Sequence, residues 1–374
     1  MLRLARRVDP AGGKGEAPSP QEVRSALDAL QHGGGRRTPR RPAEIPALIQ
    51  ACLRLARWAE ATDVDTAEGC VKTAMRLDPG HNEPVFELAL LARSRGDSDT
   101  AEELFLESIH LAMERRAWKA VAMAWLALGR LYQKNGNRED EAVSAYVRAL
   151  RTAREHGVGE AEAFALHNLC VMALIRKDLE AGLSYARKAL DAYGHDPKGI
   201  RILAQDLAWY WMDAEGAYER ALPIFRAVLP STAGDERRQL QVNANLARAA
   251  AGAGEHDEYR QARRAVRKQL QRNPENEQAA PALLELARGA FSIGESREAT
   301  EDAREALRHA LARDEVQTAR EIEALLEQIA AGAFERPATS SAAVLAGAEQ
   351  LATRLLLLLR TDSFAATPGA LDAG

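Results

Sequence analysis

The sequence predicts an all-α protein, an α-solenoid built from about seven helical hairpins. Hydrophobic residues make up 46% of the 374 residues but aromatic residues only 5%. This composition, rich in Ala, Leu, Glu and Arg, is typical of helices that pack closely through small side chains. A pattern of small residues also recurs along most of the chain. Because each hairpin of such a stack rests on its neighbours, the whole length can form one elongated array instead of separate domains.

Residues 1–46 are predicted to be a flexible basic leader. Residues 1–47 carry nine Lys and Arg against five Asp and Glu, with six prolines and the GGG of 33–35. Such a segment buries too little apolar surface to offset the entropy lost on ordering. The alternative is that RRTPRRP at 36–42 is an arm that contacts phosphate or docks a partner. The leader lacks the apolar stretch of a signal peptide, so no export is predicted.

A recurring frame defines the hairpins of residues 47–331. Each unit has a small residue in its first helix and a compact residue about 12 positions later in its second helix. The first-helix anchors, 34 to 41 residues apart, are Leu55, Ala89, Gly129, Cys170, Trp209, Ala247 and Ala287. The second-helix partners are Ala67, Ala101, Ala142, Gly182, Ala221, Tyr259 and Ala299. The turns RSRGDSD, QKNGNRED, AGAGEHD and SIGESRE offer glycines that can end one helix and polar residues that can cap the next.

Two units depart from this frame. Trp209 stands where a small residue lets the two helices approach, and the surrounding LAWYWMD is bulky, so the fifth hairpin is expected to be splayed or irregular. Tyr259 replaces the usual alanine of the sixth unit. These two hairpins are the weakest part of the assignment.

The frame resembles the tetratricopeptide repeat, whose consensus places Trp, Leu-Gly, Tyr, Ala, an aromatic residue and Ala in this order. The third unit matches it through Trp125, Leu128, Gly129, Tyr132, Ala142, Tyr146 and Ala149. The fourth, ALHNLCVMALIRKDLEAGLSYARKAL, resembles the longer units of peptide-sensing bacterial regulators and cargo-binding light chains. The resemblance covers residues 47–331 and implies a right-handed superhelix.

The array also needs a cap at its carboxyl-terminal end. VQTAREIEALLEQIAAG at 316–332 is expected to begin this cap, and AAVLAGAEQLATRLLLLLR at 342–360 to shield it further, within a capping helix and tail of 332–374. The second segment contains Glu349, Gln350 and Arg354, and its five consecutive leucines fall far short of the roughly 20 apolar residues of a membrane span. It is therefore expected to be a packing helix.

The motifs of common enzymes do not occur in the sequence. It contains no GxxxxGK[ST] loop, GxSxG elbow, HExxH helix or paired CxxC, and its eight histidines never stand four residues apart. Acidic pairs fall at turns or first helical turns, where they cap helices. Cys52, Cys70 and Cys170 are interpreted as small buried residues of a protein in the reducing cytoplasm. We therefore expect no enzyme, no cofactor and no metal site.

Residues that flank the anchors are predicted to line the concave groove of the array. The candidate partner-binding residues are Arg93, Arg130, Lys134, His167, Asn168, Tyr210, Asn245, Arg248 and Arg288. The groove is expected to be basic at several points, with apolar surface between them. Its arginines are either solvated charges or contacts to an acidic or carboxylate-bearing partner, and Arg130, Arg248 and Arg288 are expected outside the packed interfaces.

Two asparagines have a more specific interpretation. Asn168 and Asn245 stand two residues before an anchor. In the peptide-sensing proteins that the chain resembles, an asparagine at this place holds a peptide backbone through both functions of its amide. The alternative is that both are buried, hydrogen-bonded structural residues.

A second basic surface is predicted on the run YRQARRAVRKQLQR at 259–272. Arg260, Arg264, Arg267 and Lys268 recur on one face of a second helix, which is expected to face outward. The face is either solvated or binds an anionic partner, and the lack of interleaved aromatic residues disfavours nucleic acid.

The leading hypothesis is a non-catalytic cytoplasmic scaffold that binds a peptide or protein segment, acidic in one alternative, in its groove. The second hypothesis is a peptide-sensing regulatory module. Since the sequence contains no recognisable helix-turn-helix, such a module would act through another chain. The sequence indicates no membrane association and does not define the oligomeric state.

Overall fold

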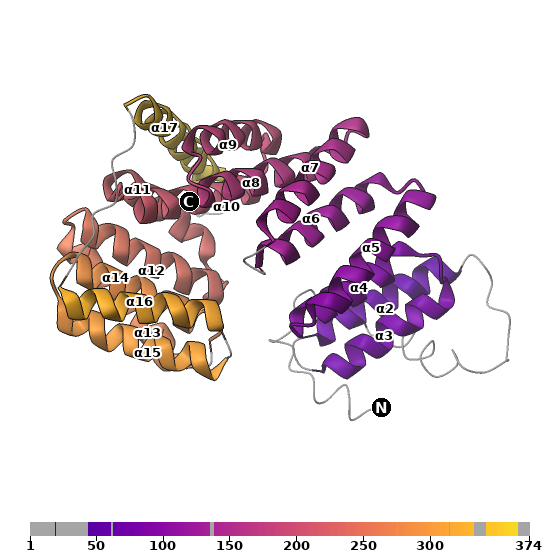
Figure 1. The fold of residues 1–374 in the computed structure, drawn as a ribbon, viewed down its shortest axis with the longest axis horizontal. Coiled ribbons are helices and arrows are strands. Elements are labelled where there is room, and N and C mark those ends of the chain that lie inside the picture. The colour runs from indigo at the N-terminus through magenta and orange to yellow at the C-terminus, as the bar shows by residue number, and fades with distance from the viewer. Residues whose placement is uncertain are drawn as a thin grey trace, which may run out of the picture. The chain divides into compact units, whose positions relative to one another are not determined.

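Helices that pack in consecutive pairs form the whole of the described structure (Figure 1). The computed structural model describes Ser19 and residues 44–60, 63–134, 138–274, 276–313, 315–332 and 342–365. Nearly all of the predicted leader lies outside these residues. The chain divides into two compact units, Met1–Met172 and Ala173–Gly374, although a single array was expected over 47–331. The right-handed path of the superhelix stays a prediction.

The first unit contains three complete hairpins and most of the first helix of the fourth. Its helices are α2 Ile45–Ala59, α3 Val64–Leu77, α4 Asn82–Ser94, α5 Ser98–Glu114, α6 Trp118–Lys134, α7 Glu139–Glu155 and α8 Gly159–Ile175, which extends into the second unit. The helices of each hairpin pack on each other, and α3 and α5 also pack on the first helix of the next hairpin. Each hairpin is therefore held by its neighbours, as a repeat array requires.

The second unit continues the same pattern. Its helices are α9 Leu179–Tyr193, α10 Pro197–Ala214, α11 Tyr218–Val228 with the 3₁₀ turn η2 Leu229–Thr232, α12 Glu236–Gly252, α13 His256–Arg272, α14 Ala279–Ser292, α15 Ser296–Ala312, α16 Val316–Ala331 and α17 Ala342–Ala365. The seven anchors and seven partners of the sequence frame all fall on the expected first and second helices of seven described hairpins. The all-α solenoid is confirmed.

Turn chemistry follows the sequence closely. Gly96, Gly254 and Gly294 adopt φ of 81°, 78° and 82° after α4, α12 and α14, a region that an L side chain rarely occupies. The next helix is capped in several hairpins by an aspartate, as where Asp97 accepts a hydrogen bond from the backbone N–H of Thr100 at 3.2 Å. Residues 135–137 of the turn QKNGNRED, which include its glycine, lie outside the described residues.

The fifth hairpin corrects the sequence frame by one residue. Ala208 is fully buried, whereas Trp209 is 36% exposed and lies on the surface of α10. A small residue is thus present at the packed position, and the indole is turned out of the hairpin. The hairpin is irregular, as expected, but the irregularity lies in its second helix, where Pro223 removes a backbone donor and η2 follows after Val228. In the sixth hairpin, Tyr259 is buried as a compact partner residue.

The carboxyl-terminal helices only partly match the predicted cap. α16 packs against α14 and α15 and so covers the last hairpin. The expectation that 342–360 adds to this cap is wrong, because α17 packs against α9, α10 and α11. Its buried face is formed by Ala348, Leu351, Ala352, Leu355 and Leu359. These residues recur at helical spacing, as expected for one apolar face of an amphipathic helix.

Among the described residues, none of the helices has the length and apolarity that crossing a bilayer would require. Cys52, Cys70 and Cys170 are buried and are not joined in disulfides, and burial raises the pKa of the Cys70 thiol to about 12. The interpretation of the cysteines as small core residues is confirmed.

Gly129 offers a direct test of the repeat frame. A Cβ at this position would lie 2.4 Å from Cε1 of Tyr146, a ring that is fully buried between α6 and α7. We expect Gly129→Ala to force the two helices apart and to lower the free energy of unfolding by about 1–3 kcal/mol. Denaturant unfolding followed by circular dichroism measures this change.

Gly69 provides the matched control. It lies in the middle of α3, and a Cβ there would have no atom within 4 Å. Gly69→Ala should raise stability by about 0.5–1 kcal/mol, since alanine favours the helix. If both variants shift stability in the same direction, the packing role of Gly129 is wrong.

Candidate functional site

All nine candidate residues lie on the first helices of hairpins, and they divide between the two units. Arg93, Arg130, Lys134, His167 and Asn168 belong to the first unit, and Tyr210, Asn245, Arg248 and Arg288 to the second. Arg130 and Lys134 are exposed, whereas His167, Asn245 and Arg248 are buried. The other four are half-buried. Each unit is described separately below.

In the first unit, Arg93 on α4 and Arg130 on α6 form a pair of neighbouring cations. Burial lowers the pKa of Arg93 below its ordinary value, and the positive charge of Arg130 lowers it further, while Glu60 opposes this effect. Within the described part of the chain, neither arginine donates a hydrogen bond or forms an ion pair with a carboxylate. We call Arg93 and Arg130 the arginine pair. It is suited to bind a carboxylate, which would relieve the repulsion between the two guanidinium groups.

A polar cluster that the sequence interpretation missed joins α2 to α4. Arg57 donates from Nε to Glu87 Oε1 at 2.7 Å and from Nη2 to Glu83 Oε1 at 2.9 Å, and Gln50 donates to Glu83 at 2.7 Å. Burial raises the pKa of Glu87 above its ordinary value, although Arg57 opposes the shift. Arg57 and Glu87 are 30 residues apart. This separation is close to the length of one repeat, which is the feature of the sequence that could have predicted the contact.

The two candidate residues on α8, His167 and Asn168, are directed largely toward the interior of the protein or to their own helix. The Nδ2 of Asn168 donates to the backbone carbonyl of Phe164 at 2.7 Å, one turn earlier in the same helix. His167 is only 6% exposed. For Asn168 the geometry favours the structural alternative.

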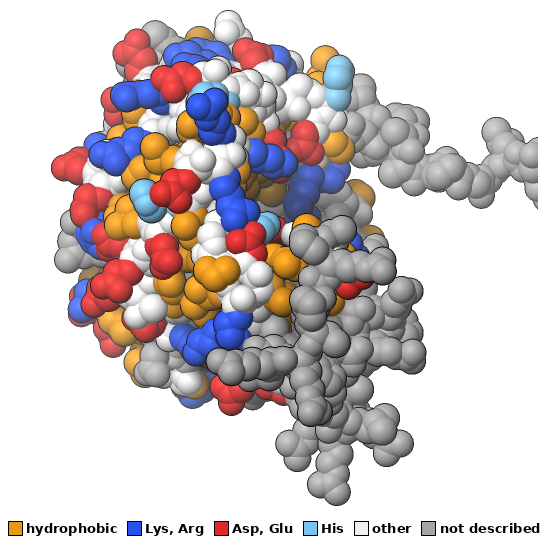
Figure 2. Space-filling model, turned by 90° about the vertical axis from the view of Figure 1, so that its right-hand side faces the viewer, with side chains coloured by type: hydrophobic (Ala, Val, Ile, Leu, Met, Phe, Trp, Pro, Cys, Tyr) orange, Lys and Arg blue, Asp and Glu red, His pale blue; other side chains and the backbone are white. Residues whose placement is uncertain are grey.

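On the face shown in Figure 2, basic and acidic side chains are interspersed with apolar ones.

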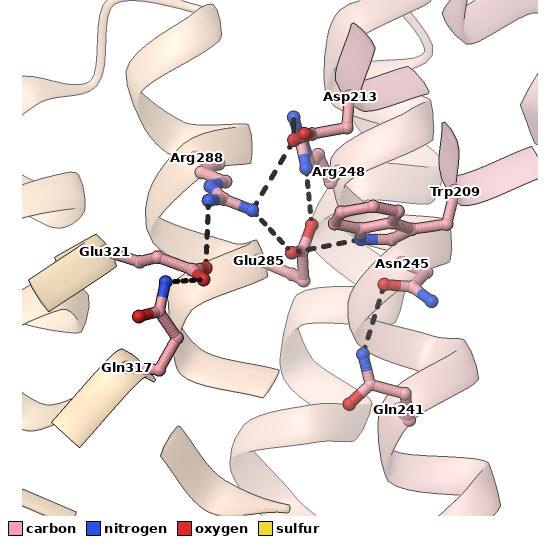
Figure 3. A network of polar contacts seen from close by, with 9 residues as sticks. All are labelled: Trp209, Asp213, Gln241, Asn245, Arg248, Glu285, Arg288, Gln317 and Glu321. Carbon is pink, nitrogen blue, oxygen red and sulfur yellow. Dashed lines mark hydrogen bonds and ion pairs between the residues drawn. The ribbon is translucent and has the colours of Figure 1, made fainter. Parts of the chain in front are cut away.

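In the second unit, a group of neighbouring polar side chains spans α10, α12, α14 and α16; seven of them are linked by hydrogen bonds and ion pairs, and Gln241 and Asn245 form a separate pair (Figure 3). We call it the α10–α16 network; its members are Trp209, Asp213, Gln241, Asn245, Arg248, Glu285, Arg288, Gln317 and Glu321. At its centre, Arg248 donates from Nη1 to Glu285 Oε2 and from Nη2 to Asp213 Oδ1, both at 2.8 Å. Glu285 also accepts from Arg288 Nη1 at 3.1 Å and from Trp209 Nε1 at 3.4 Å.

The outer part of the network is looser. Arg288 lies 3.5 Å from Asp213 Oδ1 and 3.7 Å from Glu321 Oε2, which is longer than a hydrogen bond. Gln317 donates to Glu321 Oε1 at 3.3 Å, and Gln241 donates to Asn245 Oδ1 at 3.3 Å. The network therefore has a tightly paired centre, Arg248 with Glu285 and Asp213, and weakly paired groups around it.

Arg248 and Glu285, at the centre of the network, have the electrostatics of a buried ion pair. Burial would lower the pKa of Arg248, but the charges of Glu285 and Asp213 outweigh burial and raise it. Burial would likewise raise the pKa of Glu285, but Arg248 and Arg288 hold it below its ordinary value. Both groups are therefore ionised, and each compensates the desolvation of the other.

Arg248 corrects the sequence expectation. It was expected outside the packed interfaces, but it is 6% exposed, and its Nη1 and Nη2 are paired with carboxylates of α14 and α10. The cause is the close approach of α12 and α14, since a Cβ on Gly289 would lie 3.1 Å from the Cα of Arg248. The network contains two arginines and three carboxylates, so the expected basic character is absent from this surface.

The basic face predicted on α13 also needs correction. Arg260, Arg264 and Lys268 are exposed as expected. Arg267 instead forms ion pairs with Asp302 and Glu305 of α15, and the buried Asp302 also binds Arg263. Arg267 therefore belongs to a helix interface. The described residues bring together no group of three or more His, Cys, Asp or Glu side chains that could hold a metal ion.

Comparison with known proteins identifies the fold. No family model and no curated protein matches the sequence. The crystal structure of yeast Tom70 matches with a TM-score of 0.50 and 15% identity over 82% of this chain. The Cut9–Hcn1 hetero-tetramer of the APC/C matches with a TM-score of 0.51 and 13% identity over 82% of this chain. The chain spans 58% and 55% of the length of those two chains. The fold is that of the tetratricopeptide repeat proteins, as the resemblance implied.

Arg248 is expected to be needed for stability. Arg248→Met leaves Glu285 buried without its main counter-charge, which should lower the free energy of unfolding by about 3 kcal/mol in chemical denaturation. The double variant Arg248→Met, Glu285→Leu should recover part of this loss, because no buried charge remains unpaired at that place. The control Arg264→Met, on the exposed face of α13, should change stability by less than about 0.5 kcal/mol. A loss for Arg264→Met as large as that for Arg248→Met would contradict this role.

Glu285 predicts a dependence of stability on acid. Its pKa in the folded protein lies below the ordinary value of 4.5, so its ionisation stabilises the fold above that pH. This contribution is lost as the pH falls through the folded pKa. The stability advantage of the wild type over Glu285→Gln should therefore shrink below pH 4.5, as measured by urea unfolding at several pH values. Glu327→Gln, exposed on α16, serves as the control. A constant difference across this range would show that Glu285 is not ionised in the folded protein.

Proposed function

We propose that this chain is a non-catalytic scaffold that binds a peptide or protein partner on the first-helix surfaces of its repeat array. The arginine pair of the first unit carries the proposal. Two neighbouring guanidinium groups that form no ion pair with a carboxylate in the described residues repel each other, an effect that Glu60 opposes only in part, and an acidic segment would offset that cost. Exposed Lys134 on the same helix α6 adds positive charge.

Other features agree with a binding role. Among the described residues, the charged clusters are ion pairs between neighbouring helices rather than nucleophile and base arrangements. Cut9, whose fold this chain resembles, was solved as a hetero-tetramer with Hcn1. Three buried cysteines without a disulfide are compatible with a reducing compartment, and we propose a cytoplasmic location.

The test is capture of partners by the immobilised full-length chain from a lysate of its host, with identification by mass spectrometry. Partners that bind the first unit should be lost from the double variant Arg93→Glu, Arg130→Glu, with affinity lowered tenfold or more, about 1.4 kcal/mol. The reversal leaves the helices intact, because neither arginine is paired within the described structure. The circular dichroism spectrum checks this.

A matched control reverses the same number of charges elsewhere. Arg264→Glu, Lys268→Glu changes two exposed cations on α13, a second helix. This variant should retain the partners that the wild type captures. If instead it loses them while the Arg93, Arg130 variant keeps them, the exposed face of α13 is the binding surface and the proposal is wrong.

A further inference from the structure

The α10–α16 network has hydrogen-bond acceptors left over after its internal pairing. Asp213 accepts hydrogen bonds only through Oδ1 among the described residues, which leaves Oδ2 without a donor. Glu321 is held only by Gln317 at 3.3 Å and by the more distant Arg288. The side chains of Asp213 and Glu321 are 34% and 45% exposed, so both carboxylates can be reached from solvent. The surface thus offers acceptors and negative charge to a ligand.

An aromatic side chain stands beside these carboxylates. Trp209 is 36% exposed although most large apolar residues of the first helices are buried. Its Nε1–H is directed toward Glu285 Oε1 at 3.4 Å (Figure 3). A bond from the indole N–H to a carboxylate increases the electron density of the ring, and the face of an indole is the preferred aromatic site for a cation. Trp209 is therefore placed and polarised to receive positive charge.

A third group in the network is suited to a peptide backbone. Asn245 is only 4% exposed, and its Oδ1 accepts from Gln241. Its Nδ2 has no hydrogen-bond partner among the described residues, and Figure 3 shows the amide next to Trp209. The amide N–H of Asn245 is a donor that a main-chain carbonyl of a bound segment can accept.

We infer that the α10–α16 network receives a lysine or arginine side chain from a bound protein segment. The cation lies against the Trp209 ring and donates to Asp213 and Glu321, while Asn245 Nδ2 donates to a main-chain carbonyl of the same segment. Arg248 and Arg288 do not fully neutralise this place, since the two arginines face three carboxylates, Asp213, Glu285 and Glu321. This assignment rests on the proposed function, and it adds that the second unit selects a partner charge opposite to that selected by the arginine pair.

Nuclear magnetic resonance of the full-length chain tests the site with small probes. The side-chain indole signal of Trp209, identified by its loss in Trp209→Phe, is followed during titration with Nα-acetyl-lysine methylamide. Nα-acetyl-Nε-acetyl-lysine methylamide is the matched control, because it has the same shape without the charge. We expect the lysine probe to shift the Trp209 signal in a saturable manner and the acetylated probe to shift it at least fivefold less at equal concentration.

The same titration on variants separates the site from general charge effects. Asp213→Asn, Glu321→Gln should weaken the shift at least threefold, whereas Glu323→Gln, an exposed glutamate elsewhere on α16, should leave it unchanged. A larger shift with the corresponding glutamate probe, or an undiminished lysine shift in the double variant, would overturn the inference.

The outcome is independent of the partner-capture experiment. If the lysine probe binds at Trp209 but the chain captures no partner, the cation site stands and the scaffold proposal fails. If partners are captured and a Trp209→Leu variant binds them with unchanged affinity, the scaffold stands and this inference fails.

Discussion

Close approach of neighbouring helices is the constraint on which the rest of this structure depends. No hairpin can bury its apolar face alone, so each must lie against the next at a distance that only small side chains permit. A methyl group at Gly129 would collide with the Tyr146 ring, and one at Gly289 would be in tight contact with the backbone of Arg248. The three alanines at anchor positions, Ala89, Ala247 and Ala287, serve the same purpose, since all three are fully buried.

The same constraint determines how charges are arranged. Stacking of similar hairpins brings equivalent positions side by side, so residues about one repeat apart in sequence become neighbours. Arg57 and Glu87 are 30 residues apart, and Arg248 and Glu285 are 37 apart. Where helices approach as closely as α12 and α14 do, the paired groups lose water and must compensate each other. This explains why Arg248 is part of the packed interface instead of a free charge.

These facts also explain what could be predicted from the sequence. Spacing, small anchors and turn glycines specify local structure, and they placed all seven hairpins on the correct segments. Trp209 was assigned one residue out of place because the anchors are 34 to 41 residues apart, so the spacing does not tell which of two adjacent residues faces the hairpin. The smaller Ala208 is the buried one. The packing of α17 against α9, α10 and α11 could not be predicted from its amphipathic pattern. This pattern shows that one face is buried, but not against which helices.

The predicted binding residues required the same distinction between a residue and its neighbours. From the sequence, Arg130, Arg248 and Arg288 looked equivalent, because each follows an anchor on a first helix. What separates them is the residue one repeat away. The α10–α16 network supplies Asp213, Glu285 and Glu321 around Arg248 and Arg288, whereas the described part of the first unit supplies no paired carboxylate to Arg93 or Arg130. The sign of each surface is thus a property of pairs of repeats. An array that keeps one backbone pattern can therefore present an arginine pair in one unit and three carboxylates around two arginines, beside an exposed indole, in the other.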